Sequence, residues 1–236
     1  MKALLVRVGA DQSGGGGYWN GPVDSHSGEF VYVPIPDGGP FHPGLAKPYS
    51  GVATRLNGKW PTLPAHLAAL DMHLDPDFEH LTYGDQGERA KQITSKLGNG
   101  DLIVFYAGLA DLHPNPQLVY ALIGLYVIED IVRANAVSSP RWHENAHTRR
   151  VTTFASNDIV VRARPNVSGR LVRALPIGSY REGAYRIRPE LLAAWGGTTV
   201  RDGYLQRSAR LPEFNDAARF YDWFQKQRVI LISRNN

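Results

Sequence analysis

The sequence predicts an α+β fold with a mixed, barrel-like β core and helices packed on its outside. Three features favour it: two apolar runs at 102–107 and 119–128 joined by a polar loop, shorter apolar runs on both sides of them, and amphipathic helix patterns between these runs. Apolar runs bounded by turn residues are typical of strands buried on both faces, although a buried helix has the same pattern. No linker-like or repeated segment interrupts the chain, so we expect residues 1–236 to form a single domain.

The first predicted strand covers residues 3–8 (ALLVRV), and a loop with four consecutive glycines at 14–17 follows it. This loop lacks the Gly-Lys-Ser/Thr ending of a phosphate-binding loop, and it opens no G-x-G-x-x-G helix. A surface loop without ligand is one interpretation. The other is a base-stacking site, because two aromatic residues directly follow the glycines. The predicted base contacts here are Arg7, Gly15, Gly16, Tyr18 and Trp19, with Asp11 as a catalytic candidate.

A second strand is predicted at 28–36 (GEFVYVPIP), where it ends at prolines, and an irregular segment rich in proline and glycine continues to residue 64. A short helix is expected from Pro64 to about Met72, because proline is tolerated in the first turn of a helix.

Three ionisable residues then alternate in His73-x-Asp75-x-Asp77. In an extended segment they would share one side, because side chains alternate along a strand. The trio could bind a metal, supply a general base with its orienting partner, or cap a turn opened by Asp75-Pro76. We rank capping first, acid–base chemistry second and metal binding last. His73 and Asp75 are therefore catalytic candidates, and no metal or cofactor is predicted.

An amphipathic helix is predicted at 88–97, and Gly98 ends it. The central hairpin follows, with its connecting loop (108–118) at a rim of the sheet. Gly124, inside the second apolar run, would suit a bulge that bends the strand. Tyr83 and Tyr106, on either side of the helix, are further predicted base contacts.

Residues 140–150 (PRWHENAHTRR) gather two histidines, three arginines and a tryptophan without apolar periodicity, which predicts a loop. Aromatic and cationic groups on a loop are suited to base stacking and phosphate binding, and a solvated connection is the alternative. The predicted nucleic-acid contacts in this segment are Trp142, Asn145, Arg149 and Arg150, with His147 as a catalytic candidate.

A strand is predicted at 158–163, and Ser168 is expected to cap a helix at 169–175. A capped helix start with Arg170 beside it would offer an anion site. Further helices are expected from Pro189 and across 214–224, followed by a strand at 229–232.

Charge is distributed unevenly around the net value of +4. Residues 141–236 carry 17 Lys and Arg against 8 Asp and Glu, whereas residues 1–140 carry a net negative charge. Arginine forks are suited to phosphate and stack on bases, so a basic region indicates a nucleic-acid binder. An arginine-rich composition without function is an equal alternative. The sequence contains no cysteine and no apolar stretch of the ~18 residues that a membrane span needs, so we expect a cytoplasmic protein without a membrane partner.

Two resemblances add to this interpretation. The hairpin sequences GDLIVFY and ALIGLYVIEDIV resemble the central strands of PUA-like barrels (PUA, ASCH, EVE and YTH domains), whose members bind RNA or modified bases. The ordered series LLVRVGAD, GEFVYVPIPD, HLDPD, YGDQG, GDLIVFYAGL, ALIGLYVIEDIV, ENAHTRR and SGRLVRALPIGS resembles the nucleotide modification associated domain 3 family over roughly residues 1–180. The segment after about Ser179 has no counterpart in that resemblance.

The second resemblance implies a place among systems that modify bases in DNA, without implying a particular reaction. We therefore expect recognition or processing of modified nucleobases in DNA, within a base-modification or restriction and defence system. An enzyme that acts on a flipped base or nucleotide by acid–base chemistry is the alternative, and an RNA-binding PUA-like module is a further one. The expected partner is nucleic acid, DNA rather than RNA, or a modified nucleotide.

Overall fold

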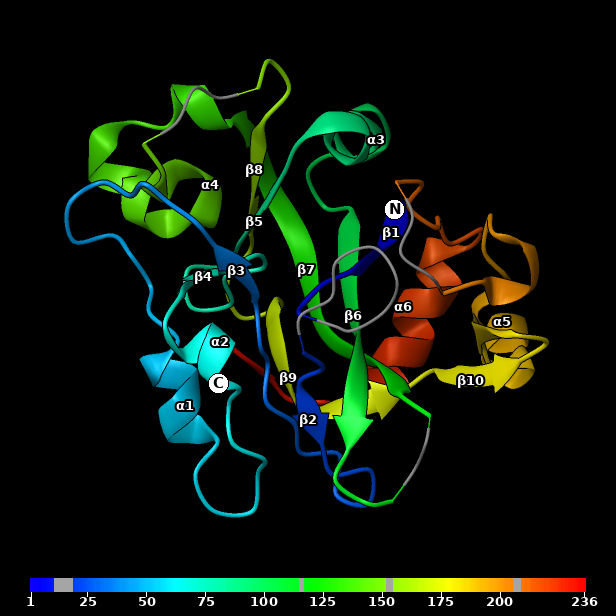
Figure 1. The fold of residues 1–236 in the computed structure, drawn as a ribbon. Helices are drawn as coiled ribbons and strands as arrows, with labels where there is room; N and C mark the ends of the chain where they lie inside the picture. Colours follow the sequence, from blue (N-terminus) through cyan, green and yellow to red (C-terminus); the bar gives the residue numbers. More distant parts are fainter. Residues whose placement is uncertain (11–18, 115–116, 152–154, 206–208) are drawn as a thin grey trace.

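The computed structural model describes residues 1–10, 19–114, 117–151, 155–205 and 209–236. At its centre lies the predicted hairpin, formed by β6 (Leu102–Asp111) and β7 (Val119–Arg133) (Figure 1). Residues 102–109 and 120–128 are buried along their whole length, as continuous apolar runs predict. The central position of this hairpin follows from its composition, because strands buried on both faces have no polar side to turn toward water.

The strand β7 is long enough to pair with two strands along the edge that faces away from β6. Its first half pairs with β9 (Gly169–Pro176), and its second half pairs with β8 (Ile159–Ala163), both antiparallel. On the other side, β6 pairs in parallel with β1 (Ala3–Arg7) and, farther along, with β2 (Pro22–Val23). The hairpin is therefore shared by two branches of one sheet.

Each branch gains one more strand. The strand β5 (Thr82–Asp85) pairs with β8, and β12 (Leu231–Ile232) pairs with β9, which completes an eight-stranded mixed sheet. The α+β class and the mixed sheet are thus confirmed. A closed barrel is not confirmed, because pairing among the described strands does not return from β5 to β1. The single-domain organisation stays a prediction.

A bulge bends β7 where Gly124 predicted it. Pairing with β6 passes from Phe105–Gly124 to Tyr106–Leu122 and leaves one residue of β7 without an opposite partner. A Cβ at Gly124 would overlap the ring of Phe78 and would lie 2.9 Å from the carbonyl oxygen of Gly169. Glycine is required here because another chain segment packs directly on the backbone.

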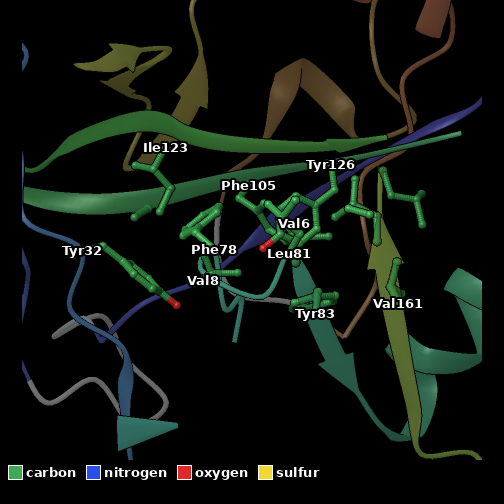
Figure 2. Packing of buried hydrophobic residues seen from close by; sticks show 14 of the residues in the cluster. Val6, Val8, Tyr32, Phe78, Leu81, Tyr83, Phe105, Ile123, Tyr126 and Val161 are labelled. Atoms are coloured by element: carbon green, nitrogen blue, oxygen red, sulfur yellow. The ribbon is translucent and has the colours of Figure 1, made fainter. Parts of the chain in front are cut away.

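Both faces of the sheet carry an apolar core. On one face, the helices α5 (Pro189–Trp195) and α6 (Ala217–Lys226) pack through buried aromatic residues such as Trp195 and Phe220. On the opposite face, the helix α3 (Gly87–Lys96) and the segment around Phe78 form a second core. Figure 2 shows the ring of Phe78 among the side chains of that core. Its centre lies 5.8 Å from the ring centre of Phe105 and 5.7 Å from that of Tyr126.

Three of the predicted helices, at 88–97, from Pro189 and across 214–224, are confirmed as α3, α5 and α6. The helix predicted from Pro64 is shorter, α2 (Ala65–Ala68), because the chain turns into β4 (Asp71–His73), which pairs with β3 (Ile35–Asp37). Of the strand predicted at 28–36, only the last residues form a regular strand, β3. Residues 30–33 are buried and make isolated backbone hydrogen bonds to neighbouring segments. A helix, α1 (Ser50–Arg55), lies in the segment predicted to be irregular.

The helix predicted at 169–175 is wrong, because this segment is the strand β9. Its backbone pairs with β7 on one side and with β12 on the other, and these ladders outweigh its helical pattern. Ser168 caps no helix: its hydroxyl accepts from the backbone N–H of Val127 at 2.9 Å. Arg170 is 4% exposed and donates to the carbonyl oxygens of Leu171 and Arg234. The anion site expected at this position therefore does not form.

The loop predicted at 140–150 is mostly helical. It contains a 3₁₀ helix, η2 (Ser139–Glu144), and a short helix, α4 (Ala146–Arg149). The remaining elements are the 3₁₀ turns η1 (Ala134–Ala136) and η3 (Arg201–Gly203) and a hairpin of β10 (Gly178–Arg181) and β11 (Ala184–Ile187). None of the helices in the described ranges has the length and apolar character that crossing a membrane requires.

We expect Gly124→Ala to destabilise the protein by about 1–3 kcal/mol, because the added methyl group overpacks a filled core. Chemical unfolding measures the change. The matched control is Gly98→Ala, where an added Cβ meets no atom within 4 Å. Equal unfolding midpoints for the two variants would show that the close approach at Gly124 is not needed.

Candidate active site

A pocket of about 310 Å³ opens beside the apolar core that contains Phe78, and its wall is largely polar. Three ionisable residues from separate segments meet on this wall: His73 from the end of β4, Asp75 from the turn after it, and His147 from α4. The remaining lining residues are Arg7, Val8, Gly9, Ile35, Pro36, Tyr83, Gly84, Asp85, Gln86, Arg89 and Arg150.

Asp75 is at the centre of the three. Its Oδ1 accepts hydrogen bonds from the backbone N–H of Gly84 at 2.7 Å and from Nδ2 of Asn145 at 2.8 Å. Its Oδ2 lies 3.1 Å from Nε2 of His73 and 3.1 Å from Nε2 of His147. These two contacts are within ion-pair distance but lack hydrogen-bond geometry, so this buried oxygen has no hydrogen bond among the described residues.

Two further carboxylates hold the imidazole rings from behind. Nδ1 of His73 lies 2.8 Å from Oδ2 of Asp37, and Nδ1 of His147 lies 2.5 Å from Oδ1 of Asp158. Asp37 and Asp158 are both buried and do not line the pocket. Because a carboxylate accepts from Nδ1–H, each ring is oriented with Nε2 toward Asp75.

Asn145 couples the position of Asp75 to that of His147. Its side-chain oxygen accepts from the backbone N–H of His147 and thereby caps the start of α4, whereas its amide nitrogen donates to Asp75. Gly84 lies against both partners: a Cβ there would overlap the imidazole of His147 and would come within 2.6 Å of the Asn145 side-chain oxygen. The site therefore requires glycine at this position of β5.

The buried charges shift one another's pKa values strongly. Burial by itself would lower the pKa of His147, but hydrogen bonding to Asp158 and the nearby Asp75 outweigh it and raise that pKa to about 10. For His73, burial is likewise outweighed by Asp37 and Asp75, and its pKa is raised. The pKa of Asp75 is lowered although burial opposes this, because both imidazoles favour the charged carboxylate.

Three arginines extend the wall of the pocket. Nε of Arg150 donates to Oδ1 of Asp37 at 2.9 Å. Arg89 lies 3.0 Å from the carboxylate of Asp85 and donates to the hydroxyl of Tyr83. Arg7 lies over the ring of Tyr120, 4.9 Å from its centre. The pocket thus combines a carboxylate–imidazole cluster with guanidinium groups that suit an anionic ligand.

Several residues predicted from the sequence do meet at this pocket. The structure brings together His73, Asp75, His147, Arg7, Tyr83 and Arg150 in its lining. Asn145 lies directly behind Asp75. Tyr83 is not arranged for stacking, because its hydroxyl donates to Asp85 at 2.5 Å and its ring packs against Phe105.

Other predicted contacts lie elsewhere. Tyr106 is 1% exposed in the core under α5 and α6, which corrects its expected role as a base contact. Trp19 is half-buried and packs against the core that α1 and α2 cover. Trp142 stacks on His42 with ring centres 3.8 Å apart, donates its indole N–H to the carbonyl oxygen of Val137, and does not line the pocket. The predicted residues Asp11, Gly15, Gly16 and Tyr18 lie outside the described residues.

Arg149 and Asp77 form a separate structural pair. Arg149 is 1% exposed, forms an ion pair with Asp77 and donates to the carbonyl oxygen of His143. This burial corrects the expectation that Arg149 contacts phosphate. Asp77 caps the turn that follows it by accepting from the N–H of Glu79 and of His80, whereas the expected cap was that of the turn opened by Asp75-Pro76. It points away from His73 and Asp75 because the turn at Asp75-Pro76 ends the alternation of an extended strand.

Sequence reasoning missed the two carboxylates that orient the histidines. Asp37 follows a Pro-Ile-Pro run and Asp158 begins a predicted strand, so no local pattern connects either with a histidine. Arg89, Asp85 and Gly84 were also missed as site residues. The one available signal was Gly84 itself, because a glycine within a strand often marks a close approach, but the sequence predicts no strand at 82–85.

Comparison with known proteins identifies the family of the chain. The model of nucleotide modification associated domain 3 matches residues 2–219, a range that contains every residue of the cluster and extends through α5 into α6. The match thus reaches beyond the roughly 180 residues over which the sequence showed a resemblance. No curated protein and no solved structure matches the chain. Because the family match covers most of the 236 residues, the protein belongs to the nucleotide modification associated domain 3 family.

Proposed function

We propose that this protein is an enzyme that acts on a nucleobase or nucleotide bound in the pocket beside Asp75. The observation that carries the proposal is the placement of one buried carboxylate between two imidazoles, each of which is oriented by a second buried carboxylate. Burying so many ionisable groups is costly unless they compensate one another, and such clusters are concentrated at functional sites. Membership of a nucleotide-modification family supports the substrate class.

An enzyme fits the pocket better than a reader of modified bases does. A reader typically holds a base between aromatic or apolar walls. Among the described residues that line the pocket, Tyr83 is the one Phe, Tyr or Trp. Its ring packs against Phe105 rather than facing an open space. The expected aromatic contacts Tyr106 and Trp142 are outside the lining. The polar wall favours chemistry over stacking.

The size and charge of the pocket limit the substrates that it can hold. A volume of about 310 Å³ is at the lower end of the ~300–1,000 Å³ typical of small-molecule sites. A single base or nucleotide fits such a volume, and a duplex does not. A base within DNA would have to leave the helix to reach Asp75, as in other base-modifying enzymes. The guanidinium groups of Arg7, Arg89 and Arg150 then bind its phosphate.

We retain modified bases in DNA, within a base-modification or defence system, as the proposed setting. Many arginines after residue 140 have internal partners, which weakens the case for a broad basic surface. Arg141 and Arg162 pair with Glu144, and Arg219 donates to the carbonyl oxygens at the end of α5. The proposed affinity for nucleic acid therefore depends on the pocket and its rim.

The first test compares Asp75→Asn with the wild-type protein on free nucleotides and on DNA with canonical and hypermodified bases. Mass spectrometry of the digested products detects any change in the bases. We expect the variant to remain folded, to keep most of its nucleotide affinity and to lose turnover by at least ~10². The matched control is Asp24→Asn, because Asp24 is also flanked by a histidine, His113, but lies outside the pocket.

Binding of modified bases by the wild-type protein without any turnover across this panel would refute the catalytic proposal and favour a reader. Equal turnover by Asp75→Asn and Asp24→Asn would place the reaction elsewhere.

The second test uses the neighbouring arginines as a matched pair. Arg149→Met leaves Asp77 buried without its cation, which typically costs about 3–5 kcal/mol of stability. The side chain of Arg150 is 33% exposed, and buried Asp37 keeps His73 as a partner, so we expect Arg150→Met to cost less, about 1–3 kcal/mol, and to weaken nucleotide binding by roughly 10-fold. Chemical unfolding and calorimetric titration with a nucleoside monophosphate measure the two effects. Unchanged affinity in folded Arg150→Met would remove this residue from the binding site.

A further inference from the structure

The cluster at Asp75 brings together three side chains that can bind a metal ion. His73, Asp75 and His147 each offer one possible ligand atom, and these atoms lie within 4.8 Å of one another. Nε2 of each histidine faces Oδ2 of Asp75. The hydrogen bonds from Nδ1 to Asp37 and to Asp158 set the ring orientation that directs both Nε2 atoms inward. Without an ion, protons on the two imidazoles balance the carboxylate, as the raised pKa values of both histidines indicate; a metal ion between the three atoms would replace those protons.

The spacing of these atoms matches ligands that share one metal ion. Metal–ligand distances of about 2.1 Å place two neighbouring ligand atoms about 3.0 Å apart at a right angle and about 3.4 Å apart at a tetrahedral angle. Each imidazole Nε2 lies 3.1 Å from Oδ2 of Asp75. The same spacing suits ion pairs with protonated imidazoles, but these contacts lack hydrogen-bond geometry and leave this oxygen, in a side chain that is 7% exposed, without a hydrogen bond among the described residues.

The surrounding shell is also that of a metal centre. Histidines that bind metals usually donate their other ring N–H to a carboxylate, which fixes the ring and raises its basicity. Asp37 and Asp158 occupy both of these positions. Arg150 offsets the charge of Asp37, so Asp75 and Asp158 leave two negative charges for a cation to balance when both imidazoles are neutral, as in metal-binding histidines. A divalent ion supplies that charge.

Two other groups of ionisable residues in the described part of the chain lack these properties. Asp24, His26 and His113 lie on the surface, where such clusters are common without an ion. In the group of Asp77, Glu79 and His80, the carboxylate of Asp77 is already paired with Arg149.

We propose that Nε2 of His73, Oδ2 of Asp75 and Nε2 of His147 bind one divalent first-row transition-metal ion, with its open coordination positions toward the pocket. This inference rests on the proposed function, because it makes the same pocket a metal-dependent active site. Two imidazoles and one carboxylate are a ligand set for Fe²⁺ or Zn²⁺ with exchangeable positions. The sequence-based ranking placed metal binding last because it considered residues 73, 75 and 77, and His147 was not part of that trio.

The test measures metal binding without a nucleotide. Protein stripped with a chelator is titrated with Co²⁺, followed by visible absorption, and with Zn²⁺, followed by calorimetry. We expect saturation at one ion per chain. His73→Gln and His147→Gln each remove a ligand, and each should weaken binding by about 100-fold or more; Asp158→Asn should weaken it by about 10–100-fold through the orientation of His147. The control His113→Gln, in the surface cluster, should bind like the wild type.

X-ray absorption on the Zn²⁺-loaded wild type provides a readout that needs no variant. Two imidazole ligands and oxygen ligands are expected, and fewer than two imidazoles would overturn the inference. Failure of the wild type to bind either metal, or equal affinity in His73→Gln and His113→Gln, would overturn it as well.

The outcomes separate this inference from the proposed function. Turnover of a nucleotide by metal-free, chelator-treated protein would refute the metal centre and leave the proposed enzyme intact. Suppose that the protein binds one ion, that the His73 and His147 variants lose it, and that no turnover is detected. This result would support the metal centre and refute the proposed substrate class.

Discussion

The structure depends on one close contact, the packing of the Phe78 ring against the backbone of Gly124. The bulge at this glycine bends β7, so that one strand pairs with β9 along its first half and with β8 along its second. The same missing Cβ leaves room for Phe78, which anchors the segment between β4 and β5 on the sheet. Because that segment carries Asp75, the bend of the sheet and the position of the site have a common cause.

The two oxygens of the buried Asp75 carboxylate have different surroundings. One oxygen is satisfied by Gly84 and Asn145, and this fixes the carboxylate firmly. The other oxygen faces two imidazoles without a hydrogen bond. Burying three ionisable groups together is costly unless they compensate one another, so their retention at the pocket indicates a use other than stability. Placement of this oxygen at the pocket wall is consistent with chemistry at that position.

The adjacent arginines at 149 and 150 illustrate the limits of composition. Both belong to a basic segment that predicts phosphate contacts, yet the backbone of α4 and the chain after it direct them differently. Arg149 is enclosed with Asp77, whereas Arg150 reaches Asp37 at the edge of the pocket. A guanidinium offers the same donors to a phosphate and to a buried carboxylate, so neighbouring residues decide which partner it has.

The sequence by itself determined the central hairpin, the bulge at Gly124 and the α+β class, because these follow from local apolar patterning and from glycine's small size. It also identified His73 and Asp75 together, and His147 as a separate candidate. Only the tertiary structure decided that they meet, since β4 and α4 are brought together by the sheet and not by any local pattern. It also replaced the helix expected at 169–175 with β9, because pairing with two neighbouring strands outweighs intrinsic propensity.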